Sequence, residues 1–219
     1  MNLVTINLPK HQVKLTTTLL PSLSKVTLIL ILTPIANQIT EKINFDTSLK
    51  LISINYGSKK ITVSTAGIAN KIPDAAKDLG TYLAISLHAP NDNIREMIMP
   101  INKKFKIKDL IKQCKFYTTI VKEKITLEYV MLRGINDNIQ CAKELVRLMA
   151  QFPCKVNLIE FNPWPGVQYL PTERKEMEKF GKIIQDSGYI ATIRRSRGKD
   201  ILGACGQLKT SSKKKFKFI

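Results

Sequence analysis

The stretch ITLEYVMLRGINDNIQCAKELVRLMAQFPCKVNLIEF, residues 125–161, decides the fold. Its first eight and last seven residues form near-continuous apolar runs, as expected of buried parallel strands. Between them, apolar residues recur at helical spacing at Ile139, Ala142, Leu145, Val146 and Met149. A strand, a helix and a second strand in this order predict a right-handed βαβ unit with parallel strands.

The same alternation continues on both sides of this stretch. Residues 61–64, 82–87 and 189–193 are further strand-like runs. A helix is predicted from the spacing of Leu110, Ile111, Cys114, Tyr117 and Val121. Another is predicted to begin at a Thr172 cap and end at Gly188, with a buried face of Met177, Phe180, Ile183 and Ile184. Five strands with helical connections predict an α/β fold with an open or partial (βα) barrel, because a complete barrel has eight strands.

The composition changes near residue 58. Residues 1–58 carry seven charged side chains, whereas residues 59–219 carry 45. We therefore divide the chain into a divergent N-terminal segment (1–58), a partial barrel core (59–208) and a basic Lys/Phe tail (209–219). The N-terminal segment has neither a helical stripe nor a sustained alternation, and residues 26–32 are its best candidate for a short strand.

The net charge of +18 points to a polyanionic partner. Nucleic acid is the first expectation and an anionic membrane surface the second, although a lysine-rich, solvated surface would give the same balance. The longest apolar stretch, residues 26–32, is far shorter than the ~20 residues needed to span a bilayer. With no secretory signal pattern either, the cytoplasm is the expected compartment.

Polar residues follow several of the predicted strands. In parallel α/β folds the carboxyl ends of the strands meet where ligands bind, so the residues there are candidates for a site. These are Ser64, Ser86, His88, Asn136 and Asn162. Such groups suit a polar small molecule such as a nucleoside, although each one is also a common turn former or structural residue.

Five short motifs carry a resemblance to a known family. They are ISLHAPND (85–92), PINKK (100–104), LEYVML (127–132), NLI (157–159) followed by Asn162-Pro163, and ACGQL (204–208). In this order and at these spacings they resemble the radical S-adenosylmethionine methyltransferases of the RlmN/Cfr type. These enzymes modify adenine C2 in 23S ribosomal RNA and transfer RNA. The resemblance covers residues 59–209.

The resemblance implies a partial barrel that holds S-adenosylmethionine and a 4Fe-4S cluster. By motif position, the cofactor contacts would be Ser64, Ser86, Leu87, His88 and Asn162. Cys205 would be the cysteine that receives a methyl group. The basic run Arg194, Arg195, Arg197 and Lys199 would favour its thiolate and is the candidate RNA contact. RNA is therefore the expected partner, as 23S rRNA and tRNA.

The sequence departs from the family at the cluster. Its cysteines, Cys114, Cys141, Cys154 and Cys205, are 27, 13 and 51 residues apart, so no C-x-x-C or C-x-x-x-C pair exists. Cys114 and Cys141 also lie on the apolar faces of predicted helices, where buried structural thiols are expected. The Gly-Glu segment that recognises the cofactor's amino group and the resolving cysteine are not found either.

Without a cluster, the isolated chain is predicted to be inactive. Three explanations stay open. The chain is a truncated or frameshifted, degenerate form of the enzyme; or it is one half of a split enzyme, completed by a separate N-terminal half; or it is a non-catalytic RNA-binding remnant. The tail supports RNA affinity in every case, because its lysines are interleaved with Phe216 and Phe218.

Overall fold

The computed structural model describes residues 2–8, 11–17, 26–28, 58, 61–163 and 166–194. The strands are β1 (Asn2–Leu8), β2 (His11–Thr17), β3 (Val26–Leu28), β4 (Ile61–Thr65), β5 (Tyr82–Ser86), β6 (Ile125–Met131), β7 (Cys154–Glu160) and β8 (Ala191–Arg194). The α-helices are α2 (Ile72–Asp78), α3 (Asp92–Ile98), α4 (Ile107–Val121), α5 (Ile139–Met149) and α6 (Arg174–Asp186). Two short 3-10 helices, η2 (Ala69–Lys71) and η3 (Pro100–Lys103), precede α2 and α4.

Among the described residues the main sheet has six strands in the order β3-β4-β5-β6-β7-β8, and every neighbouring pair is parallel. This confirms the α/β class and the five predicted strands, and β3 falls inside the stretch 26–32. Strands β1 and β2 form a separate antiparallel pair. The proposed boundaries near residues 58 and 208 border ranges outside the described residues and stay predictions.

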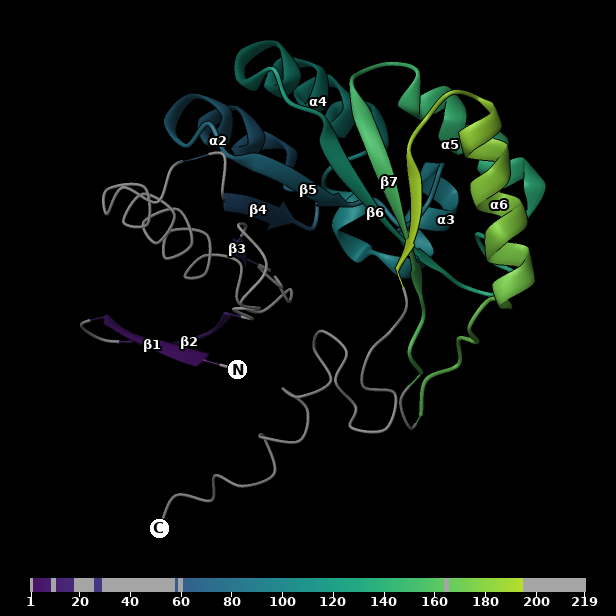
Figure 1. Ribbon diagram of the computed structural model, residues 1–219, viewed down its shortest axis with the longest axis horizontal. Helices are drawn as coiled ribbons and strands as arrows, with labels where there is room; N and C mark the ends of the chain where they lie inside the picture. The colour runs from purple at the N-terminus through teal and green to yellow at the C-terminus, as the bar shows by residue number, and fades with distance from the viewer. Residues whose placement is uncertain are drawn as a thin grey trace.

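The two faces of the sheet differ in chemistry. In β6 the burial alternates residue by residue, so Leu127, Tyr129 and Met131 are buried while Glu128 and Val130 are only partly buried. Strand β7 repeats this pattern. The apolar face packs against helices, which Figure 1 shows along the outer side of the curved sheet. The near-continuous apolar run expected from the sequence is therefore a one-sided strand, because the second face carries polar side chains.

The core lies between the apolar face and the helices. Tyr129 of β6 and Phe180 of α6 stack with ring centroids 5.5 Å apart, and both are almost fully buried. The Tyr117 hydroxyl of α4 donates a hydrogen bond to the Thr81 carbonyl at 2.5 Å. The hydrogen bond satisfies the one polar atom of the buried tyrosine, while its ring fills the core.

One predicted helix start is wrong. Helix α6 begins at Arg174 with Glu173 at the N-cap, and no side chain caps it. The Thr172 hydroxyl instead donates to Asp137 Oδ2 at 2.8 Å, which ties the start of α6 to the loop after β6. The predicted end is confirmed: Gly188 follows the C-cap with φ +87°, and its amide donates to the Gln185 carbonyl.

Within the ranges that the structure describes, no helix is long and apolar enough to cross a bilayer.

Candidate cofactor and substrate site

The face of the sheet turned away from the helices is lined with polar groups. Strand register places on this one face the side chains of Thr62, Ser64, Tyr82, Ser86, Thr126, Glu128, Lys155, Asn157, Thr192 and Arg194. A parallel sheet with helices on one side only leaves its other face for a ligand or another chain segment. We call this surface the polar face.

The polar face brings together three of the residues predicted from the sequence. Ser64 in β4, Ser86 in β5 and Arg194 in β8 all point to it, and Ser86 lies opposite Glu128 in the register. Leu87 differs, because its side chain is fully buried in the apolar core. Only its backbone borders this region, and there its amide donates to the Glu128 carbonyl and its carbonyl accepts from Arg95.

His88 lies directly after Leu87, in a left-handed conformation with φ +57°. Its Nδ1 accepts a hydrogen bond from the Val130 amide at 3.1 Å, so a neutral ring carries its proton on Nε2. Burial, together with the nearby charge of Arg95, lowers the pKa of His88 from 6.5 to about 4. The ring is therefore neutral at pH 7 and presents a fixed N–H donor.

Asn136 holds the loop of His88 against the end of β6. Its fully buried side chain donates to the carbonyls of His88 and Val130 and accepts from the Leu132 amide, at 2.7–2.8 Å. The Tyr129 hydroxyl donates to the Asn136 carbonyl. Both N–H groups of the Asn136 side chain, and its Oδ1 atom, thus have partners inside the protein. Asn136, grouped with the rim candidates in the sequence, is a positioning residue.

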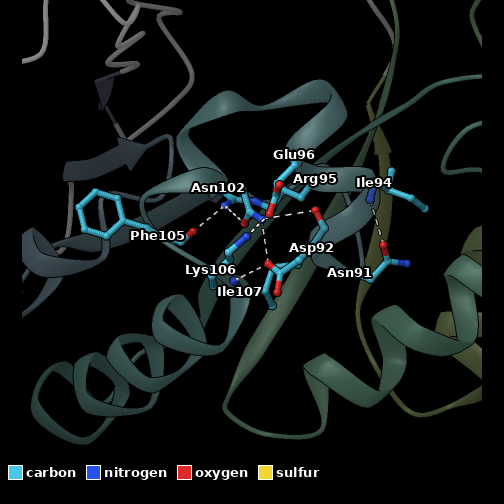
Figure 2. Close-up of polar contacts among 9 residues, drawn as sticks. All are labelled: Asn91, Asp92, Ile94, Arg95, Glu96, Asn102, Phe105, Lys106 and Ile107. Atoms are coloured by element: carbon cyan, nitrogen blue, oxygen red, sulfur yellow. Dashed lines mark hydrogen bonds and ion pairs between the residues drawn. The ribbon is translucent and has the colours of Figure 1, made fainter.

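The buried Arg95, drawn with its neighbours in α3 and the following segment in Figure 2, joins the ends of β4 and β5. Arg95, in α3, has no exposed surface. Its guanidinium donates to the carbonyls of Ala66, Ser86 and Leu87 at 2.9–3.1 Å and to Asn102 Oδ1 at 2.9 Å. A longer bond of 3.5 Å reaches the Phe105 carbonyl. The loops that follow Ser64 and Ser86 are therefore fixed by one side chain.

The motifs around this arginine supply its second layer of contacts. Asp92 Oδ1 accepts from Asn102 Nδ2 and from the Ile107 amide, so it fixes Asn102 and caps α4. Asn91 Oδ1 caps α3 through the Ile94 amide, and Lys106 forms an ion pair with Glu96 next to these residues (Figure 2). Residues 91–107 thus form one hydrogen-bonded unit around Arg95, which links it to the loops after β4 and β5.

The described cysteines do not fit an iron–sulfur cluster. Cys114, Cys141 and Cys154 are buried and free, on α4, α5 and β7. Burial raises the pKa of all three, that of Cys154 to about 12, so they are thiols rather than thiolate ligands. Among the described residues no three His, Cys, Asp or Glu side chains group as metal ligands. The expectation that Cys114 and Cys141 are buried is confirmed.

A nucleoside cofactor fits the polar face better. The hydroxyls of Ser64 and Ser86, the carboxyl of Glu128 and the amide of Asn157 lie along it, and the buried Glu128 Oε2 has no hydrogen-bond partner in the described structure. Asn162, two residues after β7, is buried. Cys205, Arg195, Arg197 and Lys199 lie outside the described residues, so their roles stay predictions.

Sequence reasoning missed Arg95 and Glu128. Arg95 carries no pattern of its own, since an arginine in a short charged helix usually faces solvent. The available signal was its place between two of the quoted motifs, ISLHAPND and PINKK. Glu128 was visible as a lone acid inside an apolar strand, where a buried charge needs a reason.

Comparisons with known proteins bear on the fold and the family of this chain. No protein-family model matches the chain. The dual-specificity RNA methyltransferase RlmN of Sinorhizobium fredii is 45% identical over 179 residues, which cover 78% of this chain and 44% of that protein. A solved radical SAM methyltransferase from Sphaerobacter thermophilus has a TM-score of 0.75 and 35% identity, over 84% of this chain and 55% of the other.

A more distant structure shares the fold alone. A domain of pyruvate-formate lyase-activating enzyme from Bacteroides vulgatus has a TM-score of 0.59 at 14% identity, over 78% of this chain and 98% of that domain. These likenesses confirm the partial barrel of radical SAM type. The chain spans less than half the length of the curated relatives it matches, 44% in the case of the Sinorhizobium fredii protein. Over that part, it is a homologue of the RlmN dual-specificity RNA methyltransferases.

Proposed function

We propose that this chain is the S-adenosylmethionine-binding part of a radical RNA adenine-C2 methyltransferase, and that it generates no radical by itself. The observation that carries the proposal is the polar face, on which two of the cofactor positions implied by the motifs, Ser64 and Ser86, lie together. The identity of 45% with RlmN over most of this chain supports it. By the same resemblance, 23S rRNA and tRNA are the substrates of the complete enzyme.

Ser64, Ser86, His88, Asn162 and the backbone at Leu87 would hold the cofactor. The bound cofactor would supply the methyl group. His88 offers a neutral N–H donor, because its Nδ1 already accepts from Val130. Arg95 and Asn136 keep the two binding loops in place without touching the ligand. This division between binding residues and positioning residues explains why the cofactor contacts come from short loops at the ends of rigid strands.

As a thiolate, Cys205 would receive the methyl group from S-adenosylmethionine, and S-adenosylhomocysteine would leave. The positive charges of Arg194, Arg195, Arg197 and Lys199 in the same part of the sequence would lower its pKa and raise its nucleophilicity. The same basic residues would bind RNA phosphates. A cytoplasmic location is part of this proposal, since the buried free thiols of the core persist where disulfides do not form.

The proposed inactivity follows from the cysteine pattern. The four cysteines contain no closely spaced triplet, and the three described ones face the helical core rather than the polar face. A degenerate form or a split enzyme with a separate N-terminal half would both have this property. Translating the other reading frames upstream of the gene would reveal a displaced cysteine-triplet segment if the frame has shifted.

Two measurements test the proposal. Equilibrium dialysis of the chain with S-adenosylmethionine is expected to show saturable, one-to-one binding, which Ser86→Ala weakens. Anaerobic reconstitution with iron and sulfide is expected to leave the protein colourless. A brown protein with stoichiometric iron would contradict the inactivity, and an absence of cofactor binding would contradict the function.

The second candidate is a non-catalytic RNA-binding remnant. The net charge of +18 favours it independently of the cofactor site. Such a remnant would be retained on a 23S rRNA fragment at low salt and would show no saturable binding of S-adenosylmethionine. The dialysis experiment therefore separates the two candidates.

A further inference from the structure

We propose that Glu128 binds the cofactor directly, through a hydrogen bond from a ribose hydroxyl to its Oε2 atom. The inference rests on the proposed function and deepens it, because it assigns a part of the ligand to a residue that the motifs do not assign. Glu128 lies in the middle of β6, on the polar face. Its register neighbours are Ser86 on one side and Asn157 on the other.

Only one of the two carboxyl oxygens has a partner. Oε1 accepts a hydrogen bond from Asn157 Nδ2 at 3.0 Å. The orientation of that amide is fixed, since the Thr192 hydroxyl donates to Asn157 Oδ1. Oε2 is buried and, among the described residues, meets no donor. The series of hydrogen bonds from Thr192 through Asn157 to Glu128 therefore ends at Oε2, an acceptor that is left free for a ligand.

An unpartnered buried carboxyl oxygen destabilises a folded protein, because it loses its water without gaining a donor. Burial also raises the pKa of Glu128, while the bond from Asn157 and the charges of Arg194 and Lys155 lower it in part. Such a group is typical of binding sites, where its partner arrives with the ligand.

The charges on the polar face indicate the kind of donor. Lys155 and Arg194 lie on the same face, one strand and two strands away from β6. Their field favours the ionised carboxylate and disfavours a cationic ligand group beside it. The ligand group that donates to Glu128 Oε2 is therefore neutral. A ribose fits this requirement, because it offers two adjacent hydroxyls. Ser86, directly opposite, places a second hydroxyl-binding group at the same level of the sheet.

The decisive variant is Glu128→Gln, which keeps the shape and the bond from Asn157 but turns a donor toward the ligand. Glu178→Gln is the matched control, since Glu178 is exposed on α6 and pairs with Arg174. The probes are S-adenosylhomocysteine and its 2′,3′-dideoxyribose analogue. For each variant, the dissociation constant is measured by calorimetry, and the midpoint of thermal unfolding without ligand by circular dichroism.

We expect Glu128→Gln to raise the dissociation constant for S-adenosylhomocysteine about tenfold, or about 1.4 kcal/mol. The dideoxy analogue should bind both proteins equally, and the unfolding midpoint should be unchanged or higher. A merely structural glutamate would instead lower that midpoint. A lowered midpoint, an unchanged dissociation constant, or equal losses for both probes would overturn the inference while leaving the proposed function standing. If the unaltered protein binds neither probe, the proposed function fails and the inference fails with it.

Discussion

The guanidinium of Arg95 shows how much one side chain contributes to the candidate site. It bonds the carbonyls of Ala66, Ser86 and Leu87, and lysine has neither the planar fork nor enough donors to replace it. We expect Arg95→Lys to lower the free energy of unfolding by about 2 to 4 kcal/mol, because buried carbonyls lose their donors. Urea unfolding measures this. Arg174→Lys, at an exposed ion pair, is the control and should change stability by less than about 0.5 kcal/mol. Equal effects of the two substitutions would contradict the assigned role.

The lowered pKa of His88 predicts that the free energy of unfolding depends on pH. Its pKa is about 4 in the folded protein, below the usual 6.5, so the unfolded chain binds more protons between these values. The contribution of His88 is therefore fully present above pH 6.5 and lost as the pH falls toward 4, by up to about 3 kcal/mol. His88→Asn removes the titrating ring, while asparagine tolerates the left-handed backbone.

Urea unfolding between pH 4.5 and 7.5 measures this dependence. The unaltered protein should lose more stability across that range than His88→Asn does. Parallel curves for the two proteins would show that His88 does not titrate with a lowered pKa. Since the chain has only two histidines, the ring resonance of His88 can be followed directly by NMR over the same range.

At the scale of elements, the turn between β4 and η2 places the backbone of Gly67 against the side chain of Arg95. Gly67 has φ +97°, and a Cβ there would lie 2.6 Å from Arg95 Nη2. Gly188, after α6, has a similar φ of +87° but nothing within 4 Å. Gly188→Ala should therefore cost about 1 kcal/mol of backbone strain alone, whereas Gly67→Ala should cost about 2 to 4 kcal/mol because it also displaces a hydrogen-bonded guanidinium. Equal losses in urea unfolding would mean that Arg95 moves aside freely.

Most elements of the core were predictable, because hydrophobic periodicity reflects burial. Residues 125–132 and 155–161 predicted β6 and β7, and the apolar spacing from Ile139 to Met149 predicted α5. The local detail was not predictable where a distant partner decides it. The sequence predicts Thr172 as the N-cap of α6, yet its hydroxyl donates to Asp137, 35 residues earlier in the chain. The same holds for the candidate site. Ser64, Ser86 and His88 were predictable because they lie at the ends of predicted strands. The role of Arg95 was not, because it depends on tertiary contacts with carbonyls.

At the scale of the whole molecule, the net charge of +18 predicts that the proposed RNA binding is electrostatic, and the basic tail is expected to contribute to it. Changing the tail lysines Lys209, Lys213, Lys214, Lys215 and Lys217 to Gln lowers the charge by five, from +18 to +13. If all five contact single-stranded RNA, the slope of log K against log salt should become shallower by about 3.5, since each contact contributes about 0.7.

A charge-matched variant separates a local contact from the overall field. Changing five exposed lysines on the helical side, Lys112, Lys115, Lys143, Lys175 and Lys179, to Gln gives the same net charge of +13. Filter binding of a 23S rRNA fragment between 50 and 200 mM salt, a range over which phosphate contacts weaken steeply, compares the two variants. The tail variant should have the shallower slope and the helical variant a nearly unchanged one, because released counterions report only the phosphates that are actually contacted. Equal slopes in both would assign the affinity to the net charge and remove the tail from the interface.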